Sequence, residues 1–149
     1  MKSEIQVFRE YIRRRSLRRT RKREEILREM FAIHGHFDVD ELHRRLKNKG
    51  SKVSKASIYR ALPLFIDCGL IREVDFKDGH WHYEHIYGHA NHSHLRCLGC
   101  GEVLEFEEPG LSLVEQQLAR EYGYLIKGHQ LQVHGYCVTC QEEQKSGSF

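Results

Sequence analysis

Two Cys-x-x-Cys pairs, Cys97/Cys100 and Cys137/Cys140, constrain the fold of this 149-residue chain more than any other feature. The half of the chain that holds them spans about 60 residues and offers few large apolar side chains, so it is marginal as a domain without a metal or a partner. Four thiolates without a histidine favour a closed, tetrahedral zinc site. We therefore predict structural Zn2+ on these four cysteines and a partner for the thin core.

A second ligand set lies just before and around the first cysteine pair, where six of the eleven histidines fall between His80 and His94. His92 and His94 alternate along an expected strand, so both point to one face. Nitrogen and oxygen ligands without sulfur suit Fe(II), Mn(II), Co(II) or Zn(II). The candidate ligands of this second site are Glu84, His92, His94 and Glu105, with His36 as a further member. An ion shared between the two halves of the chain would fix their orientation, as a switch requires.

The charge is divided between the halves. Residues 1–80 hold 20 Lys/Arg and 12 Asp/Glu, a net +8, whereas residues 81–149 hold 4 and 9, a net −5. This division is typical of a nucleic-acid binder with a sensor or assembly module, although charge asymmetry can also serve solubility alone. No apolar run reaches the roughly 18 residues of a membrane span. The N-terminus has no apolar signal core, so we expect a cytoplasmic protein with reduced thiols.

Apolar periodicity predicts four helices in the basic half. The first buries a face within residues 5–12. The other three are bounded by capping residues and glycines, namely Thr20 to near Gly35, Asp38 to Gly50, and Ser54 to Gly69. Pro63 predicts a kink in the last of them, because proline lacks an N–H and crowds the preceding turn.

Short helices joined by tight connections fit a helix-turn-helix, whose second helix presents its N-terminal residues to base edges. The candidates for DNA contact are Lys55, Ser57, Tyr59 and Arg60, unless they are surface residues only. Two strand-like runs, 70–76 and 80–83, flank an Asp-Gly turn and predict a β-hairpin wing. Residues 1–84 are thus expected to form a winged-helix DNA-binding domain.

The acidic half shows a mixed pattern. Strands are predicted at 95–98, 103–106 and 124–134, with a helix over 111–122 closed by Gly123. The polar tail, 141–149, is expected to fray.

Taken in order, these motifs resemble the ferric uptake regulator (Fur) superfamily of metal-dependent bacterial repressors. The resemblance covers roughly residues 15–140, and its motifs are Thr20-x-x-Arg23-x-x-Ile26-Leu27, His36, Ser57-Ile58-Tyr59-Arg60, the wing, His92-x-His94 and both Cys-x-x-Cys pairs. It implies an α+β fold: an N-terminal winged-helix DNA-binding domain (1–84), a hinge (85–91), and a small α/β dimerisation and metal-binding domain (92–149). It also implies a homodimer that closes on a double-stranded, AT-rich palindromic operator when metal is bound.

The resemblance further assigns residue roles. It places structural zinc on Cys97, Cys100, Cys137 and Cys140, and the regulatory metal on His36, Glu84, His92, His94 and Glu105. Residues like Arg18 and Arg19 reach the DNA grooves, and Tyr59 and Arg60 approach bases and backbone.

Several positions depart from the family pattern. Asn91, Ser93 and Ser112 stand where a third metal site would have ligands, and of that site only His129 remains, so we predict that it is absent or weak. The looser spacing from Glu84 to His92 would let His82 or His85 replace or join Glu84.

The ligand types also rank the regulatory metals. No cysteine lies between Glu84 and His94, unlike in zinc sensors, and Glu105 stands where peroxide sensors prefer aspartate. Fe2+ is therefore the first choice, with Mn2+ and Zn2+ as alternatives.

Two rival interpretations lie outside this family. His82-Tyr83-Glu84 followed by Cys97-x-x-Cys100 is similar to the zinc deaminase pattern, but no proline precedes Cys97 and the second cysteine pair would have no role. A zinc-stabilised architectural protein without metal sensing is the other rival. We expect no enzymatic activity.

Overall fold

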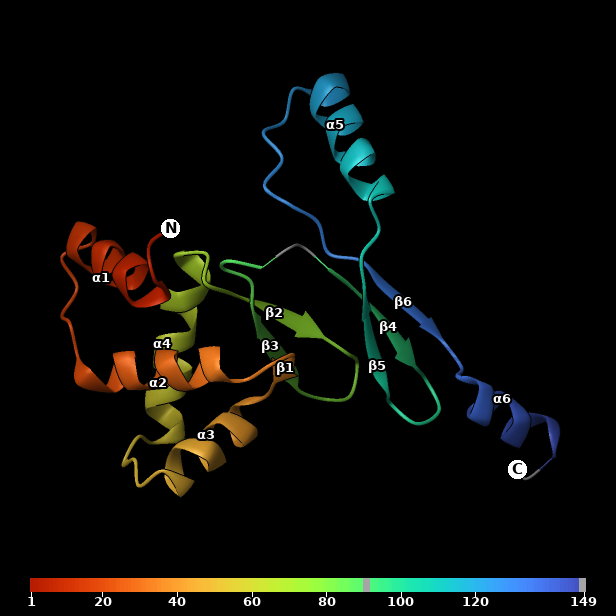
Figure 1. Ribbon diagram of the computed structural model, residues 1–149, viewed down its shortest axis with the longest axis horizontal. Helices are drawn as coiled ribbons and strands as arrows, with labels where there is room; N and C mark the ends of the chain where they lie inside the picture. The colour runs from red at the N-terminus through yellow and green to blue at the C-terminus, as the bar shows by residue number, and fades with distance from the viewer. Residues whose placement is uncertain (90–91, 148–149) are drawn as a thin grey trace. The chain divides into compact units, whose positions relative to one another are not determined.

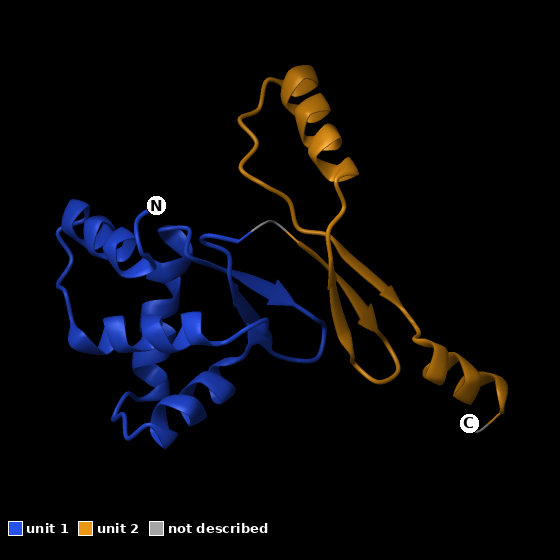
Figure 2. Cartoon of the chain, viewed as in Figure 1, with its two compact units in different colours: residues 1–89 blue, residues 90–149 orange. Residues whose placement is uncertain are grey.

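The protein is described by a computed structural model covering residues 1–89 and 92–147. The chain divides into two compact units, residues 1–89 (unit 1) and 90–149 (unit 2), which Figure 2 shows in separate colours. Within the described ranges, every helix is too short or too polar to cross a membrane. A hinge at 85–91 stays a prediction.

Unit 1 contains four helices, each started by a side chain that accepts a backbone N–H. They are α1 (Glu4–Arg14), α2 (Arg21–Ala32), α3 (Val39–Asn48) and α4 (Lys55–Asp67), with N-caps Ser3, Thr20, Asp38 and Ser54 (Figure 1). Such caps satisfy backbone donors that the helix itself leaves unpaired. The N-caps predicted from the sequence, Thr20, Asp38 and Ser54, are confirmed.

The core of unit 1 draws on all four helices. Phe8 and Phe65 are fully buried and meet edge to face, with ring centroids 4.9 Å apart. Ile26, Leu27 and Leu42 are also fully buried against this cluster. Helix α4 remains continuous through Pro63, which lies on its exposed side.

A three-stranded antiparallel sheet completes unit 1. It consists of β1 (His36–Phe37), β2 (Ile71–Asp75) and β3 (Trp81–His85), in the order β1-β3-β2. Strands β2 and β3 form the predicted wing hairpin, with Arg72 opposite Glu84. Strand β1 was not predicted, because two residues are too few to show a periodic pattern. Helices followed by this hairpin make unit 1 a winged helix.

Unit 2 is built on a second three-stranded sheet. Its strands are β4 (Ser93–Cys97), β5 (Val103–Phe106) and β6 (Gln132–Gly135), in the order β5-β4-β6. The β4–β5 pair is antiparallel and the β4–β6 pair is parallel. Helix α5 (Gly110–Tyr122) ends at Gly123, whose left-handed φ of 68° suits glycine.

Two predictions for unit 2 are wrong. Only residues 132–134 of the third predicted strand, 124–134, lie in β6, and Tyr124 and Leu125 are exposed instead. The tail does not fray from residue 141, because α6 (Val138–Lys145) forms there. The eight-residue helix has little apolar periodicity, so no sequence pattern predicts it.

Unit 2 leaves much of its apolar surface uncovered. Helix α5 has no buried residue, and its apolar side chains Leu113, Leu118 and Tyr122 are 66%, 41% and 62% exposed. An amphipathic helix gains stability mainly from burying such a stripe. The exposed stripe therefore agrees with the thin core inferred from the sequence.

Candidate metal centres and DNA-binding surface

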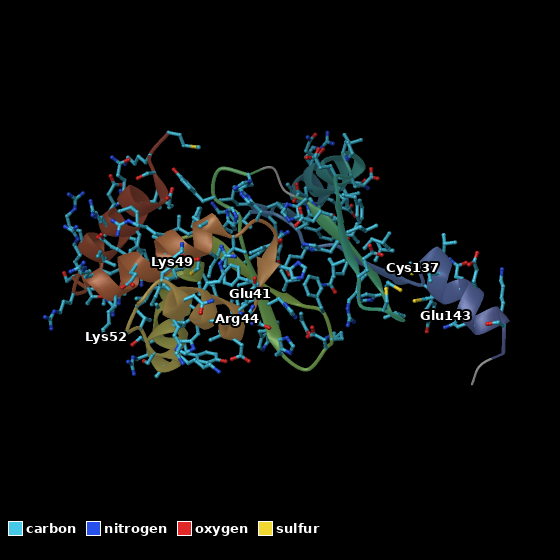
Figure 3. All side chains as sticks on the ribbon, turned by 60° about the horizontal axis from the view of Figure 1, so that its bottom comes forward. Glu41, Arg44, Lys49, Lys52, Cys137 and Glu143 are labelled. Atoms are coloured by element: carbon cyan, nitrogen blue, oxygen red, sulfur yellow. The ribbon has the colours of Figure 1, made fainter. Side chains whose placement is uncertain are left out.

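The four paired cysteines converge within unit 2. Cys97 ends β4, Cys100 lies in the following turn, Cys137 caps α6 and Cys140 lies in its first turn. Each offers a sulfur within 4.8 Å of the other three, and the Cys100 and Cys137 sulfurs are 3.9 Å apart. Figure 3 shows sulfur atoms gathered beside Cys137 at the start of α6. The sequence prediction that the two pairs meet is thus confirmed.

The backbone at Gly99 and Cys137 lies close to the cysteine sulfurs. A Cβ on Gly99 would lie 2.6 Å from the Cys140 sulfur, so the position between the first two cysteines requires glycine. The backbone N–H of Cys137 donates to the Cys97 sulfur at 3.3 Å and lowers the pKa of that thiol to about 6. The Cys137 sulfur and burial raise the pKa of Cys140 to about 12. Four crowded thiols resist full ionisation together, and a divalent cation such as zinc removes that resistance.

Two of the proposed regulatory ligands meet in unit 1. His36 on β1 is the register partner of Glu84 on β3, so the unpredicted strand brings them onto adjacent strands. Arg72 Nε donates to Glu84 Oε1, which places a guanidinium on this carboxylate. The His36 ring packs against Phe76 and His82, with centroid distances of 4.6 and 5.3 Å.

The other three proposed regulatory ligands meet in unit 2. His94 on β4 is the register partner of Glu105 on β5. His92 Nε2 lies 3.7 Å from Glu105 Oε1, and the His92 and His94 ring centroids are 5.2 Å apart. The β4–β5 pair thus gathers two imidazoles and a carboxylate, a donor set that suits a first-row divalent ion.

His85 does not support its suggested role as a replacement for Glu84. Its Nε2 lies 2.8 Å from the carbonyl oxygen of Ile33, and its ring packs on Phe31 at 4.8 Å. Because side chains alternate along β3, His85 faces the opposite side of the strand from Glu84. His82 shares the face of Glu84, but its Nε2 lies 2.6 Å from Asp78 Oδ2 on the wing.

His129, the one ligand left of a third metal site, lies beside a carboxylate. His129 Nδ1 lies 2.8 Å from Glu115 Oε1, a carboxylate that the sequence analysis did not single out. Ser112 donates its hydroxyl to the carbonyl of Pro109. Within residues 1–89 and 92–147, His129 joins no group of three metal-ligand side chains. Asn91 lies outside the described residues.

The predicted DNA-reading residues lie on the first two turns of α4. Tyr59 is 58% exposed, whereas Ile58 beside it is fully buried. Lys55 Nζ lies 2.6 Å from Asp40 Oδ1, and an Arg60 N–H donates to Ser57 Oγ at 3.4 Å. The hydrogen bond that Lys55 donates to Asp40 raises the pKa of Lys55. These contacts hold the polar face of α4 in place at the surface.

The basic linker before α2 is anchored by one buried carboxylate. Glu24 is 5% exposed and lies within 2.8 Å of both Arg9 Nε and Arg19 Nε. The side chain of Arg23 donates to the carbonyl of Arg18 at 2.6 Å. Further basic side chains, including Arg44, Lys49 and Lys52, follow on α3 and the next loop (Figure 3). The Arg19 side chain and the Arg18 backbone are therefore held by defined contacts.

A third ligand cluster, not predicted from the sequence, lies on the wing. Asp78, His80 and His82 each place a donor atom within 4.8 Å of the others. The sequence pattern that could have predicted this cluster is the spacing of His80 and His82. Residues two apart in an extended segment place their side chains on the same face.

A winged helix with an exposed basic recognition helix, followed by a unit with a four-cysteine centre, defines a metal-dependent DNA-binding regulator. The sequence profile of the Ferric uptake regulator family matches residues 14–134. The chain is 36% identical over 121 residues to a ferric uptake regulation protein of Rhizobium leguminosarum bv. viciae, covering 81% of this chain and 84% of that protein. It is 30% identical over 132 residues to the peroxide-responsive repressor PerR of Staphylococcus epidermidis, covering 89% and 88%.

The solved structures agree with the sequence relatives. The ferric uptake regulator of Pseudomonas aeruginosa with manganese superposes with a TM-score of 0.73 at 26% identity, covering 85% of this chain and 95% of that one. The chain therefore belongs to the ferric uptake regulator family, and it is a metal-responsive transcriptional regulator.

Proposed function

We propose that this protein is an Fe(II)-dependent repressor that binds operator DNA as a metal-loaded homodimer. The observation that carries the proposal is the pair of nitrogen- and oxygen-donor sets, His36 with Glu84 and His92 with His94 and Glu105, each assembled by strand pairing. We infer that one regulatory ion takes ligands from both sets. Binding would then couple metal occupancy to the orientation of the DNA-reading unit.

The structural ion in this proposal is zinc on Cys97, Cys100, Cys137 and Cys140. A four-thiolate set is closed and contributes to folding rather than to exchange with the metal pool. Because unit 2 has few buried apolar side chains of its own, the zinc ion links β4 to α6 and replaces part of a missing core. The exposed apolar stripe of α5 is then covered by the second copy in the homodimer.

The DNA-reading surface comprises the start of α4 and the linker before α2. We assign base and backbone contacts on an AT-rich palindromic operator to Arg18, Arg19, Lys55, Ser57, Tyr59 and Arg60. Exposure of Tyr59 and the net positive charge of residues 1–80 support this assignment. A two-fold symmetric dimer matches a palindrome because each copy reads one half-site.

Iron is favoured as the regulatory ion by the donor set. Neither set of donors contains sulfur. The acid that accompanies His92 and His94 is Glu105 rather than an aspartate. Manganese and zinc remain the alternatives within the family, in which one relative is a peroxide-responsive repressor and one solved regulator carries manganese. We assign no catalytic role, and we place the action of the protein in the cytoplasm, where its operator would lie.

Metal titration of operator binding tests the proposal. Fluorescence anisotropy with a labelled operator, at fixed salt, should show affinity rising at least tenfold with Fe(II) under anaerobic conditions. His92→Ala should abolish the rise while the structural zinc stays bound. His134→Ala, which removes an exposed histidine from β6 of the same sheet, is the matched control.

Two outcomes would contradict the proposal. Operator affinity that is equal with and without every divalent ion would favour the architectural alternative. Release of the zinc by His92→Ala would show that the ligands are wrongly assigned between the zinc site and the regulatory site.

A further inference from the structure

The wing carries a cluster of metal-ligand side chains that the regulatory and zinc sites do not use. Its members Asp78, His80 and His82 lie in the turn between β2 and β3 and on the first residues of β3. His82 Nε2 lies 2.6 Å from Asp78 Oδ2, and His80 Nε2 lies 3.7 Å from the same oxygen. Two imidazole nitrogens therefore converge on one carboxylate oxygen.

A second carboxylate lies beside one of the two imidazoles. Asp38 Oδ2 lies 3.2 Å from His80 Nε2. The other oxygen of Asp38 accepts the N-cap hydrogen bond from the Glu41 backbone N–H at 2.7 Å, so the aspartate is fixed in place. The start of α3 and the tip of the wing thus face the same imidazole.

The basic side chain nearest in sequence to this cluster is paired with another carboxylate. Lys77, the basic residue of the wing turn, is held by Asp75, with Nζ 2.7 Å from Oδ2 and its backbone N–H donating to Oδ1. His82 is 9% exposed, and its Nδ1 is buried with no hydrogen-bond partner among the described residues. One carboxylate and two imidazoles therefore lie within 4.8 Å of one another, and no described contact places a lysine or arginine among them.

The spacing suits a transition-metal ion. Ligand atoms placed about 2.0–2.1 Å from a four-coordinate zinc-like ion lie roughly 3.4 Å apart. Within the group, His80 Nε2 and Asp78 Oδ2 are 3.7 Å apart, close to that value, and the His82–Asp78 contact of 2.6 Å needs to open by less than about 1 Å. The set is two nitrogens and one oxygen, a mixture that binds Zn(II), Co(II) or Ni(II).

We propose that Asp78, His80 and His82 form an additional site for a first-row divalent ion on the wing, with Asp38 holding the His80 ring. The ion replaces the hydrogen bond between His82 and Asp78. It ties the wing turn to the N-terminus of α3, and it neutralises carboxylates beside the recognition helix. The site is independent of the proposed regulatory site, because His80 and Asp78 belong to neither regulatory half-set.

Trp81 provides a local reporter for this site. It is the only tryptophan of the chain, lies between the two histidine ligands, and is 53% exposed. Co(II) quenches tryptophan fluorescence at short range, so binding on the wing should quench Trp81. The full-length, zinc-loaded His92→Ala protein removes the regulatory contribution, and the absence of cobalt–thiolate absorption shows that the zinc has not been displaced.

The experiment compares variants in that background. We expect saturable quenching with one equivalent of Co(II) in His92→Ala, and at least tenfold weaker binding when either His80→Ala or Asp78→Asn is added. His34→Ala, which removes an exposed histidine elsewhere in unit 1, should leave the titration unchanged. Far-UV circular dichroism and unchanged bound zinc show that each variant is folded.

The outcomes separate this site from the proposed function. Quenching that survives both His80→Ala and Asp78→Asn, or quenching already lost in His92→Ala alone, overturns the wing site. Metal-independent operator binding together with persistent wing quenching would instead overturn the proposed repressor mechanism and leave the wing site standing.

Discussion

The buried carboxylate of Glu24 gives the sharpest quantitative prediction for this protein. Its hydrogen bond with Arg9, and then that with Arg19, lower the pKa of Glu24 from 4.5 to about 2. A difference of that size corresponds to about 3 kcal/mol of stability at neutral pH. Because the Arg9 and Arg19 side chains are 40% and 60% exposed, solvent screening reduces the expected value to about 1–2 kcal/mol.

The pH dependence follows from the direction of the shift. The folded pKa lies below the unfolded one, so the stabilisation is fully present above pH 4.5 and is lost as the pH falls toward 2. We expect Glu24→Gln to lower the free energy of unfolding by about 1–2 kcal/mol at pH 7. At pH 3, less than about half of this difference in the free energy of unfolding between the two proteins should remain.

Urea denaturation followed by Trp81 fluorescence measures this effect, because the single tryptophan lies in unit 1. Glu25→Gln is the matched control, since it removes the adjacent helical carboxylate, for which the structure describes no ion pair. An equal loss from both variants, or a Glu24→Gln effect that does not change between pH 7 and pH 3, would refute the electrostatic reasoning.

Three further changes test other parts of the structure. Arg60→Ala should weaken operator binding by about 1–3 kcal/mol in an anisotropy titration, while light scattering still shows a dimer; a monomer would argue against its assigned role. Cys140→Ser should release the zinc, measured by native mass spectrometry, and should unfold α6; full zinc retention would count against a four-thiolate site. Phe65→Ala should cost about 3–5 kcal/mol in urea denaturation, because it empties the centre of the unit 1 core against Phe8. A loss below about 1 kcal/mol would mean that the core collapses around the gap.

Local signals predicted much of the fold. The N-caps Thr20, Asp38 and Ser54 start helices where the sequence placed them, because capping is decided within one turn. The wing hairpin followed equally from an Asp-Gly turn between two short strand-like runs. Strand β1 and helix α6 escaped prediction, since one is two residues long and the other lacks an apolar period.

The candidate sites were also predicted only in part from local signals. Two Cys-x-x-Cys pairs specify a four-thiolate centre from their chemistry alone, and the structure confirms that they meet. The contact of His36 with Glu84 depends on β1, and the Asp38–His80 contact joins residues 42 positions apart in the sequence.

By itself, the sequence determined the ligand chemistry, the charge division and the starts of three helices, because each depends on residues close together along the chain. Only the tertiary structure decided which distant donors share a site. It showed that Arg9 pairs with Glu24, that His85 lies against the carbonyl of Ile33, and that Asp38 approaches His80. Such contacts depend on strand pairing and helix packing over long sequence separations, which no local pattern encodes.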